Sequence, residues 1–132
     1  MSLTARIETG LRGAAREEVS EKNTAIAYGS GSINVFATPA MIGLMEKAAL
    51  SSVDPLLPEG HSTVGIKVEV EHVAATPIGG LVEAKSELLE IDGRRLIFKV
   101  EAFDGKGLVG RGSHERFIVA TEKFLTKIKE RL

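Results

Sequence analysis

The sequence has no cysteine and no tryptophan, one tyrosine and only four prolines. Without cysteine, the chain forms no disulfide, thiolate metal site or cysteine nucleophile, and a reducing cytoplasm is the location that we expect. The net charge of −1 and the scarcity of aromatic side chains argue against a nucleic-acid-binding surface. No run of about 18 apolar residues occurs, so we expect no membrane span.

The remaining composition is that of one globular domain over residues 1–132. Hydrophobic residues make up 43% of the chain and charged residues 27%, which are ordinary values for a soluble protein. With three histidines and no cysteine, we expect no metal site, and we expect no cofactor. Residues 28–32, with two glycines and two serines, are predicted to form a mobile loop.

The clearest predicted helix begins at Thr38–Pro39. Threonine is a favoured N-cap, and proline is favoured at the first helical position because it has no N–H to satisfy there. Residues 40–50, AMIGLMEKAAL, are apolar nearly all round, which is typical of a helix enclosed by the rest of the protein. We expect this helix to end near Ser51–Ser52.

Five strands are predicted around this helix. Residues 11–19 form an early strand, and residues 63–72 alternate between apolar and polar side chains with a period of two, which indicates a half-buried strand. Glycine-containing turns then separate three further strands, and a short amphipathic helix ends the chain. These last segments are 81–91, 94–103, 108–119 and 121–132.

One antiparallel sheet wrapped around a single central helix is the hot-dog fold, which belongs to the α+β class. Such a sheet has free edges that must be covered or paired. We therefore expect a homodimer formed edge to edge.

His72 is the most informative single residue of the sequence. The alternation places it on the same inward face as Val64, Ile66, Val68 and Val70. A lone histidine on an apolar face is more often a core side chain with one hydrogen bond than a catalyst. The pattern alone leaves both interpretations open.

Glu46 and Thr38 are the candidates on the helix. Glu46 lies between apolar Ile42 and Leu50, so it is either half of a solvated stripe with Lys47 or a general base in a cleft. Thr38 serves either as an N-cap or at a helix N-terminus that polarises a carbonyl oxygen. About 12 Å of helical rise separates the two. Contact between them therefore needs non-helical first residues, a bridging substrate or a partner subunit.

His114 and Arg116 share one face of the last strand. A surface ion pair and a contact to a phosphate are both compatible with Arg116.

Three segments together resemble the fluoroacetyl-CoA thioesterase-like branch of the hot-dog thioesterases. They are VFATPAMIGLMEKAAL (35–50), TVGIKVEVEHVAATPIG (63–79) and GRGSHERFIV (110–119). The resemblance implies hydrolysis of an acyl-CoA thioester at a site on a dimer interface. Carried over residue by residue, it assigns the catalytic threonine, glutamate and histidine to Thr38, Glu46 and His72, and substrate binding to Gly65 and Arg116.

The resemblance leaves two chemical routes open: Glu46 attacks the thioester carbonyl, or Glu46 and His72 activate a water. The family's namesake shields its site with a bulky aromatic lid before the catalytic threonine. Residues 28–33, YGSGSI, are mostly small at that place. We therefore expect an acyl group other than fluoroacetyl, larger or more polar.

Two other functions are compatible with this fold. A non-catalytic hot-dog protein would bind an acyl-CoA or a related small ligand without cleaving it. A hot-dog hydratase or dehydratase would need a histidine on or beside the helix, and no histidine occurs between Phe36 and Gly60, which argues against this alternative.

Overall fold

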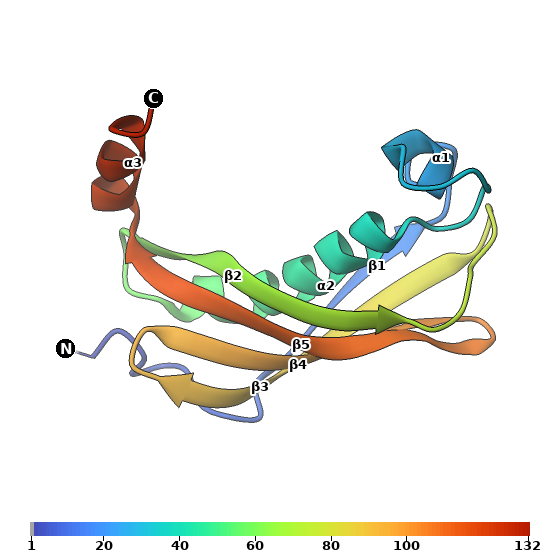
Figure 1. Ribbon diagram of the computed structural model, residues 1–132. Helices are drawn as coiled ribbons and strands as arrows, with labels where there is room; N and C mark the ends of the chain where they lie inside the picture. Colours follow the sequence, from blue (N-terminus) through green and yellow to red (C-terminus); the bar gives the residue numbers. More distant parts are fainter. Residues whose placement is uncertain (1) are drawn as a thin grey trace.

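The computed structural model describes residues 2–132 and shows a curled antiparallel sheet around one long helix (Figure 1). This is the predicted α+β hot-dog arrangement. The elements in chain order are β1 (Arg12–Glu18), α1 (Ala25–Tyr28), α2 (Thr38–Val53), the 3-10 turn η1 (Asp54–Leu56), β2 (His61–His72), β3 (Leu81–Asp92), β4 (Arg95–Asp104), β5 (Gly107–Ala120) and α3 (Thr121–Lys129).

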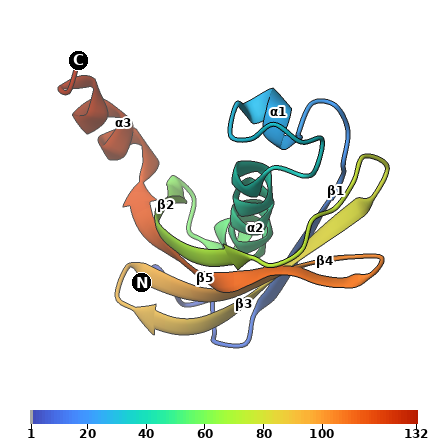
Figure 2. The same cartoon turned by 45° about the vertical axis from the view of Figure 1, so that its right-hand side comes forward.

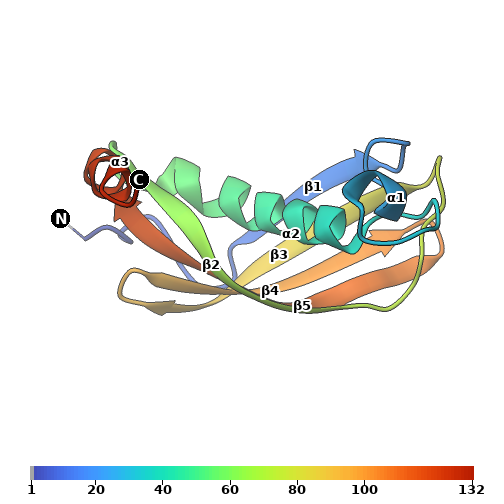
Figure 3. The same ribbon diagram turned by 45° about the horizontal axis from the view of Figure 1, so that its top comes forward.

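The five strands run in the order β1-β3-β4-β5-β2, and every neighbouring pair is antiparallel. The long helix α2 lies across the concave face of the sheet (Figure 3). The meander β3-β4-β5 forms the middle of the sheet, and β1 and β2 are its two edges. After α2 and η1 the chain continues into β2, which lies along a free edge of the sheet.

Helix α2 is buried along one face, which consists of two neighbouring rows of side chains. Its buried side chains recur every four residues, as expected for one helix face. They are Ala40, Met41, Leu44, Met45, Ala48, Ala49 and Val53. Each large apolar side chain of this stripe contributes about 1.5–3 kcal/mol by leaving water. A second column at the same spacing, Thr38, Ile42, Glu46 and Leu50, is partly or fully exposed and carries the candidate residues.

The N-cap prediction for Thr38 is wrong. The helix begins at Thr38 with Ala37 as its N-cap, and no side chain makes a capping hydrogen bond. The Thr38 hydroxyl instead bonds to a side chain of β2, so a tertiary partner takes the oxygen that local rules assign to the cap. The helix also continues beyond Ser51–Ser52, to Val53.

The segment predicted as a mobile loop, residues 28–32, starts at the last residue of the short helix α1. Thr24 caps it by accepting a hydrogen bond from the backbone N–H of Ala27, and Gly29 ends it with a left-handed φ of 70°. This conformation favours glycine. The residues after it, up to Asn34, are exposed.

Strand β2 departs from regular alternation at a bulge between Gly65 and Lys67. The extra residue shifts the inside–outside phase by one position. Val68 and His72 remain on the inward face, because Val68 pairs with buried His114. Val64 pairs with Phe117 on the outer face, so the prediction that it shares the face of His72 is wrong.

Helix α3 leaves the end of β5 on the α2 side and extends beyond edge strand β2 (Figure 2). None of its side chains is buried. Among residues 2–132, no helix is long and apolar enough to cross a membrane.

Candidate active site

Thr38 and His72 form the first group of candidate side chains. Thr38 is the first residue of α2 and His72 the last of β2, and their Oγ1 and Nδ1 atoms share a hydrogen bond of 2.8 Å. The other ring nitrogen, Nε2 of His72, is buried and has no hydrogen-bond partner within the described chain. A buried polar atom without a partner is costly, so this nitrogen is suited to receive one from a bound molecule.

The Thr38–His72 pair lines a hollow of about 380 Å³. The other lining residues are small or apolar: Ala25, Ser30, Val35, Phe36, Val73, Ala74 and Ala75. Burial lowers the pKa of the His72 imidazole, and the backbone of Ala74 offsets part of this effect. The imidazole is therefore neutral at pH 7 and able to accept a proton.

Glu46, Gly65, His114 and Arg116 form the second group, called the Arg116 cluster below. The Glu46 Oε2 atom lies 3.9 Å from both His114 Nε2 and Arg116 Nη1. His114 and Arg116 project from one face of β5 and are only 1% and 6% exposed. Arg116 is thus a buried cation, and the surface ion pair considered for it does not occur.

Three hydrogen bonds hold the Arg116 guanidinium in place. Nε donates to Thr63 Oγ1 at 2.8 Å and Nη2 to the Thr63 carbonyl at 3.1 Å, while Nη1 donates to His114 Nε2 at 3.1 Å. Thr63 Oγ1 in turn donates to Asp54 Oδ1 at 2.5 Å. Burial lowers the pKa of Arg116, but the carboxylates of Asp54 and Glu46 counteract it and the guanidinium stays charged.

The tautomer of His114 follows from its two partners. Its Nδ1 lies 2.8 Å from the Lys67 carbonyl, which can only accept, so Nδ1 carries the proton. Its Nε2 accepts from Arg116 and therefore carries none. Burial first, and the charge of Arg116 as a smaller cause, lower the pKa of His114, so the ring is neutral.

Gly65 sits where a side chain would collide with this cluster. A Cβ atom there would lie 2.7 Å from Glu46 Oε2 and 3.2 Å from His114 Cε1. The glycine therefore lets β2 approach the Glu46 carboxylate and leaves its own backbone bare beside it.

The structure divides the five predicted site residues between these two groups. It brings Thr38 to His72, and Glu46 to Gly65 and Arg116, but it does not bring Glu46 to His72 within one chain. The two groups lie two turns apart on the exposed column of α2, about 12 Å along its axis. Because α2 is regular from Thr38 onward, the prediction of non-helical first residues is excluded.

The sequence interpretation missed the parts of the Arg116 cluster that lie behind the site. It placed His114 beside Arg116 without a role, and it named neither Thr63 nor Asp54. The only signal was two polar side chains at spacing two before buried Ile118. No three His, Asp or Glu side chains in the described part of the chain are placed to hold a metal.

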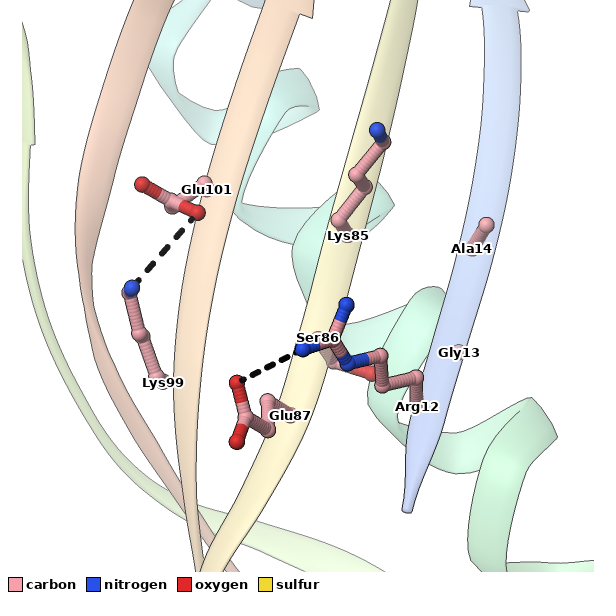
Figure 4. A pocket seen from close by; sticks show the side chains of 8 residues that line it. All are labelled: Arg12, Gly13, Ala14, Lys85, Ser86, Glu87, Lys99 and Glu101. Atoms are coloured by element: carbon pink, nitrogen blue, oxygen red, sulfur yellow. Dashed lines mark ion pairs between the residues drawn. The ribbon is translucent and has the colours of Figure 1, made fainter. Parts of the chain in front are cut away.

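A separate hollow of about 460 Å³ lies on the outer face of the sheet (Figure 4). Charged side chains of β1, β3 and β4 line it, in the ion pairs Arg12–Glu87 and Lys99–Glu101. It contains none of the predicted site residues. The sheet separates it from α2, so it is not the candidate site.

Comparisons with known proteins identify the family of the chain. Residues 19–122 match the family of fluoroacetyl-CoA-specific thioesterases. A fluoroacetyl-CoA thioesterase of Streptantibioticus cattleyicolor is 42% identical over 97 residues, which cover 74% of this chain and 70% of the relative.

Two solved structures share the fold. A threonine-to-serine variant of a fluoroacetyl-CoA thioesterase, in complex with acetyl-CoA, has a TM-score of 0.87 and 34% identity, covering 95% of this chain and 98% of its own. A hot-dog-like protein from Thermanaerovibrio acidaminovorans has a TM-score of 0.91 and 26% identity, covering 100% and 98%.

Proposed function

The chain belongs to the family of fluoroacetyl-CoA-specific thioesterases, and on that premise we propose that it hydrolyses an acyl-CoA thioester to the free acid and CoA. The observation that carries the proposal is the 2.8 Å bond between Thr38 and His72 beside a hollow, with the second nitrogen of a neutral imidazole left without a partner. This arrangement suits a group that binds or deprotonates a reactant.

The proposed roles of Glu46, His72, Thr38 and Gly65 follow from their surroundings. Glu46 either attacks the thioester carbonyl or, with His72, takes a proton from the attacking water. Thr38 orients His72 by their hydrogen bond, and the carbonyl oxygen gains charge beside the N–H groups of α2 or of Gly65. In the water route, the C–S bond then breaks, CoA leaves as its thiolate and takes the proton, and the acyl carbon keeps the oxygen of water. In the nucleophile route, breaking the C–S bond leaves the acyl group on Glu46 as a mixed anhydride, which water then hydrolyses to the free acid and the Glu46 carboxylate.

A homodimer is part of this proposal, because the two groups do not meet in one chain. Strand β2 is a free edge, and its side chains Ile66 and Val68 are 50% and 40% exposed. An exposed apolar edge strand is a ready partner for a second copy of itself.

Antiparallel pairing of two β2 strands about Lys67–Val68, the middle of the exposed stretch, places His72 opposite residues 62–64 of the partner subunit. Paired strands lie about 4.8 Å apart. The Thr38–His72 pair of one protomer then lies beside the partner's Gly65, and so beside its Arg116 cluster. Each dimer has two such composite sites.

The first experiment measures free CoA released from a panel of acyl-CoAs by wild type, Glu46→Gln and His72→Ala. We expect each variant to lower kcat/KM on the order of 100-fold or more while its thermal unfolding stays close to wild type. Wild-type turnover by both variants would end the assignment. Ligand binding without any release of CoA by wild type would indicate a non-catalytic binding protein.

Mixing the two variants tests the composite site. A dimer of one Glu46→Gln chain and one His72→Ala chain has one site with both lesions and one site with none. We expect about a quarter of wild-type activity after random exchange of subunits, because half of the dimers are then mixed. A mixture as inactive as its parents would place the whole site in one chain.

The panel also tests the acyl group. The hollow beside Thr38 is bordered by Ala25 and Ser30 rather than by large aromatic side chains of α1 and its loop. We expect a higher kcat/KM for an acyl-CoA larger or more polar than fluoroacetyl-CoA, and a preference for fluoroacetyl-CoA would contradict this. The cytoplasmic location remains a prediction.

A further inference from the structure

We propose that His114 is a positioning residue of the thioesterase site: its neutral imidazole holds the Arg116 guanidinium at the place where it faces Glu46 and the acyl group. This inference rests on the proposed function and adds a residue to it. His114 does not line the hollow beside Thr38, and the His114 atom that faces Gly65 is the ring carbon Cε1, 3.2 Å from where a Cβ would lie, which neither donates nor accepts a proton. It acts only through Arg116.

The geometry leaves His114 no freedom. Its side chain is completely buried, one ring nitrogen donates to the Lys67 carbonyl at 2.8 Å, and the other accepts from Arg116 Nη1 at 3.1 Å. The ring of Phe98 stacks on it with a centroid distance of 6.3 Å. Because both ring nitrogens are hydrogen-bonded and Phe98 packs on the face of the ring, the lone pair of Nε2 stays directed at Arg116.

The Lys67 carbonyl belongs to the bulge of β2, directly after Gly65. His114 therefore ties the irregular part of the edge strand to the guanidinium on β5. The position of Gly65 and the position of Arg116 are set by the same imidazole. A site built from two strands needs such a link to keep both within reach of one small substrate.

A count of donors shows what this link leaves available. Of the five N–H bonds of Arg116, Thr63 accepts two and His114 accepts one. Two remain, one on Nη1 and one on Nη2, and Nη1 lies 3.9 Å from Glu46 Oε2. Thr63 holds the Nε–Nη2 edge of the planar fork, and His114 is the partner that holds its Nη1 corner.

Two substitutions separate positioning from a merely structural role. Asparagine at position 114 keeps a donor near the place of Nδ1 for the Lys67 carbonyl but has no acceptor that reaches Arg116. Glutamine places an acceptor near Nε2 for Arg116 and loses the contact to Lys67. We expect His114→Asn to lower kcat/KM about 10- to 100-fold and His114→Gln to lower it less than about threefold. The opposite order would overturn the proposal, because it would mean that the strand contact matters and Arg116 does not.

A double-mutant cycle adds the second measurement. Arg116→Lys removes the fork that His114 holds, so His114→Asn should cost less than about twofold further in that background. Equal fold-losses in both backgrounds would overturn the proposal. Activity retained by Glu46→Gln and His72→Ala would instead remove the proposed function. Inactive Glu46→Gln together with a fully active His114→Asn would remove only this inference.

Discussion

The Arg116 cluster and the Thr38–His72 pair occupy the same column of α2, yet they are built in opposite ways. In the cluster, the polar side chains on β5 are buried, three hydrogen bonds hold the Arg116 guanidinium, and both ring nitrogens of His114 have partners. In the pair, one hydrogen bond joins the two side chains, and a hollow and an unpartnered nitrogen lie beside it.

This difference indicates that the two groups have different roles. A guanidinium held by three hydrogen bonds cannot rearrange cheaply, so the cluster presents a fixed positive charge beside the partly exposed Glu46 carboxylate. A buried nitrogen without a partner costs about 1–3 kcal/mol, and this cost disappears when a water or substrate atom reaches it. In the proposed site, the cluster is the preorganised half and the pair is the receiving half. Substitutions in the two groups should therefore lower kcat/KM by different amounts.

The largest effect is expected at the pair. Thr38→Val keeps the size of the side chain but removes the hydroxyl that bonds to His72 Nδ1, so the imidazole loses its only side-chain restraint. We expect kcat/KM to fall about 100-fold, because a catalytic group that is misplaced by about 1 Å loses that much. Stability should change by less than about 1 kcal/mol, since Thr38 is exposed.

Thr38→Ser is the matched control, because it keeps the hydroxyl and removes only a methyl group. It should retain activity within about fivefold of wild type, measured by the same CoA-release assay. If valine and serine variants were equally impaired, the methyl group and not the hydrogen bond would be the important feature, and the contrast between the two halves would weaken.

A smaller effect is expected in the cluster, at Gly65. The Cβ of Gly65→Ala would meet the Glu46 carboxylate at 2.7 Å, and the carboxylate would have to move because His114 and Arg116 behind it are fixed. We expect kcat/KM to fall about tenfold, with little change in the midpoint of thermal unfolding, because a side chain end and not backbone must shift.

Gly43→Ala controls for adding a methyl group to this part of the molecule. Gly43 lies on the solvent side of α2, and a Cβ there meets nothing within 4 Å. Activity should be unchanged and stability should rise by about 0.5–1 kcal/mol, since alanine favours helix. A Gly65→Ala enzyme as active as Gly43→Ala would show that the cluster is not rigid.

The sequence was sufficient for most of the fold because the signals are local. The period of two, the glycine turns and the apolar run of residues 40–50 predicted β3, β4, β5 and α2 to within one to three residues of their observed bounds. The errors occur where a tertiary contact overrides a local rule. Thr38 gives its hydroxyl to His72 rather than to the helix end, and the bulge after Gly65 reverses the phase of β2.

The site was less predictable for the same reason. Alternation indicated that His114 and Arg116 share a face, but burial and the link through Thr63 to Asp54 depend on strand pairing and on the turn after α2. Helical rise correctly indicated that Thr38 and Glu46 do not touch in one chain. No local pattern says which of the remaining solutions the protein uses, because neither a bridging substrate nor a partner subunit leaves a signal in the residues near these two groups.

The smallest expected effect is on stability, and it compares the two halves through their histidines. Burial lowers the pKa of both His72 and His114 in the folded chain, whereas an unfolded histidine titrates near 6.5. Below about pH 6.5 the unfolded chain therefore binds protons that the folded chain does not, and the free energy of unfolding must fall as the pH decreases from 7. Replacing either histidine by glutamine removes its share and makes this decrease shallower. His114→Gln should flatten it more, because that ring is completely buried and lies beside Arg116.

Urea unfolding between pH 7.5 and 5, at one protein concentration, measures the three slopes. Equal slopes for wild type and both variants would mean that neither half holds its imidazole neutral, and a flatter slope for His72→Gln than for His114→Gln would reverse the assignment of the more rigid half.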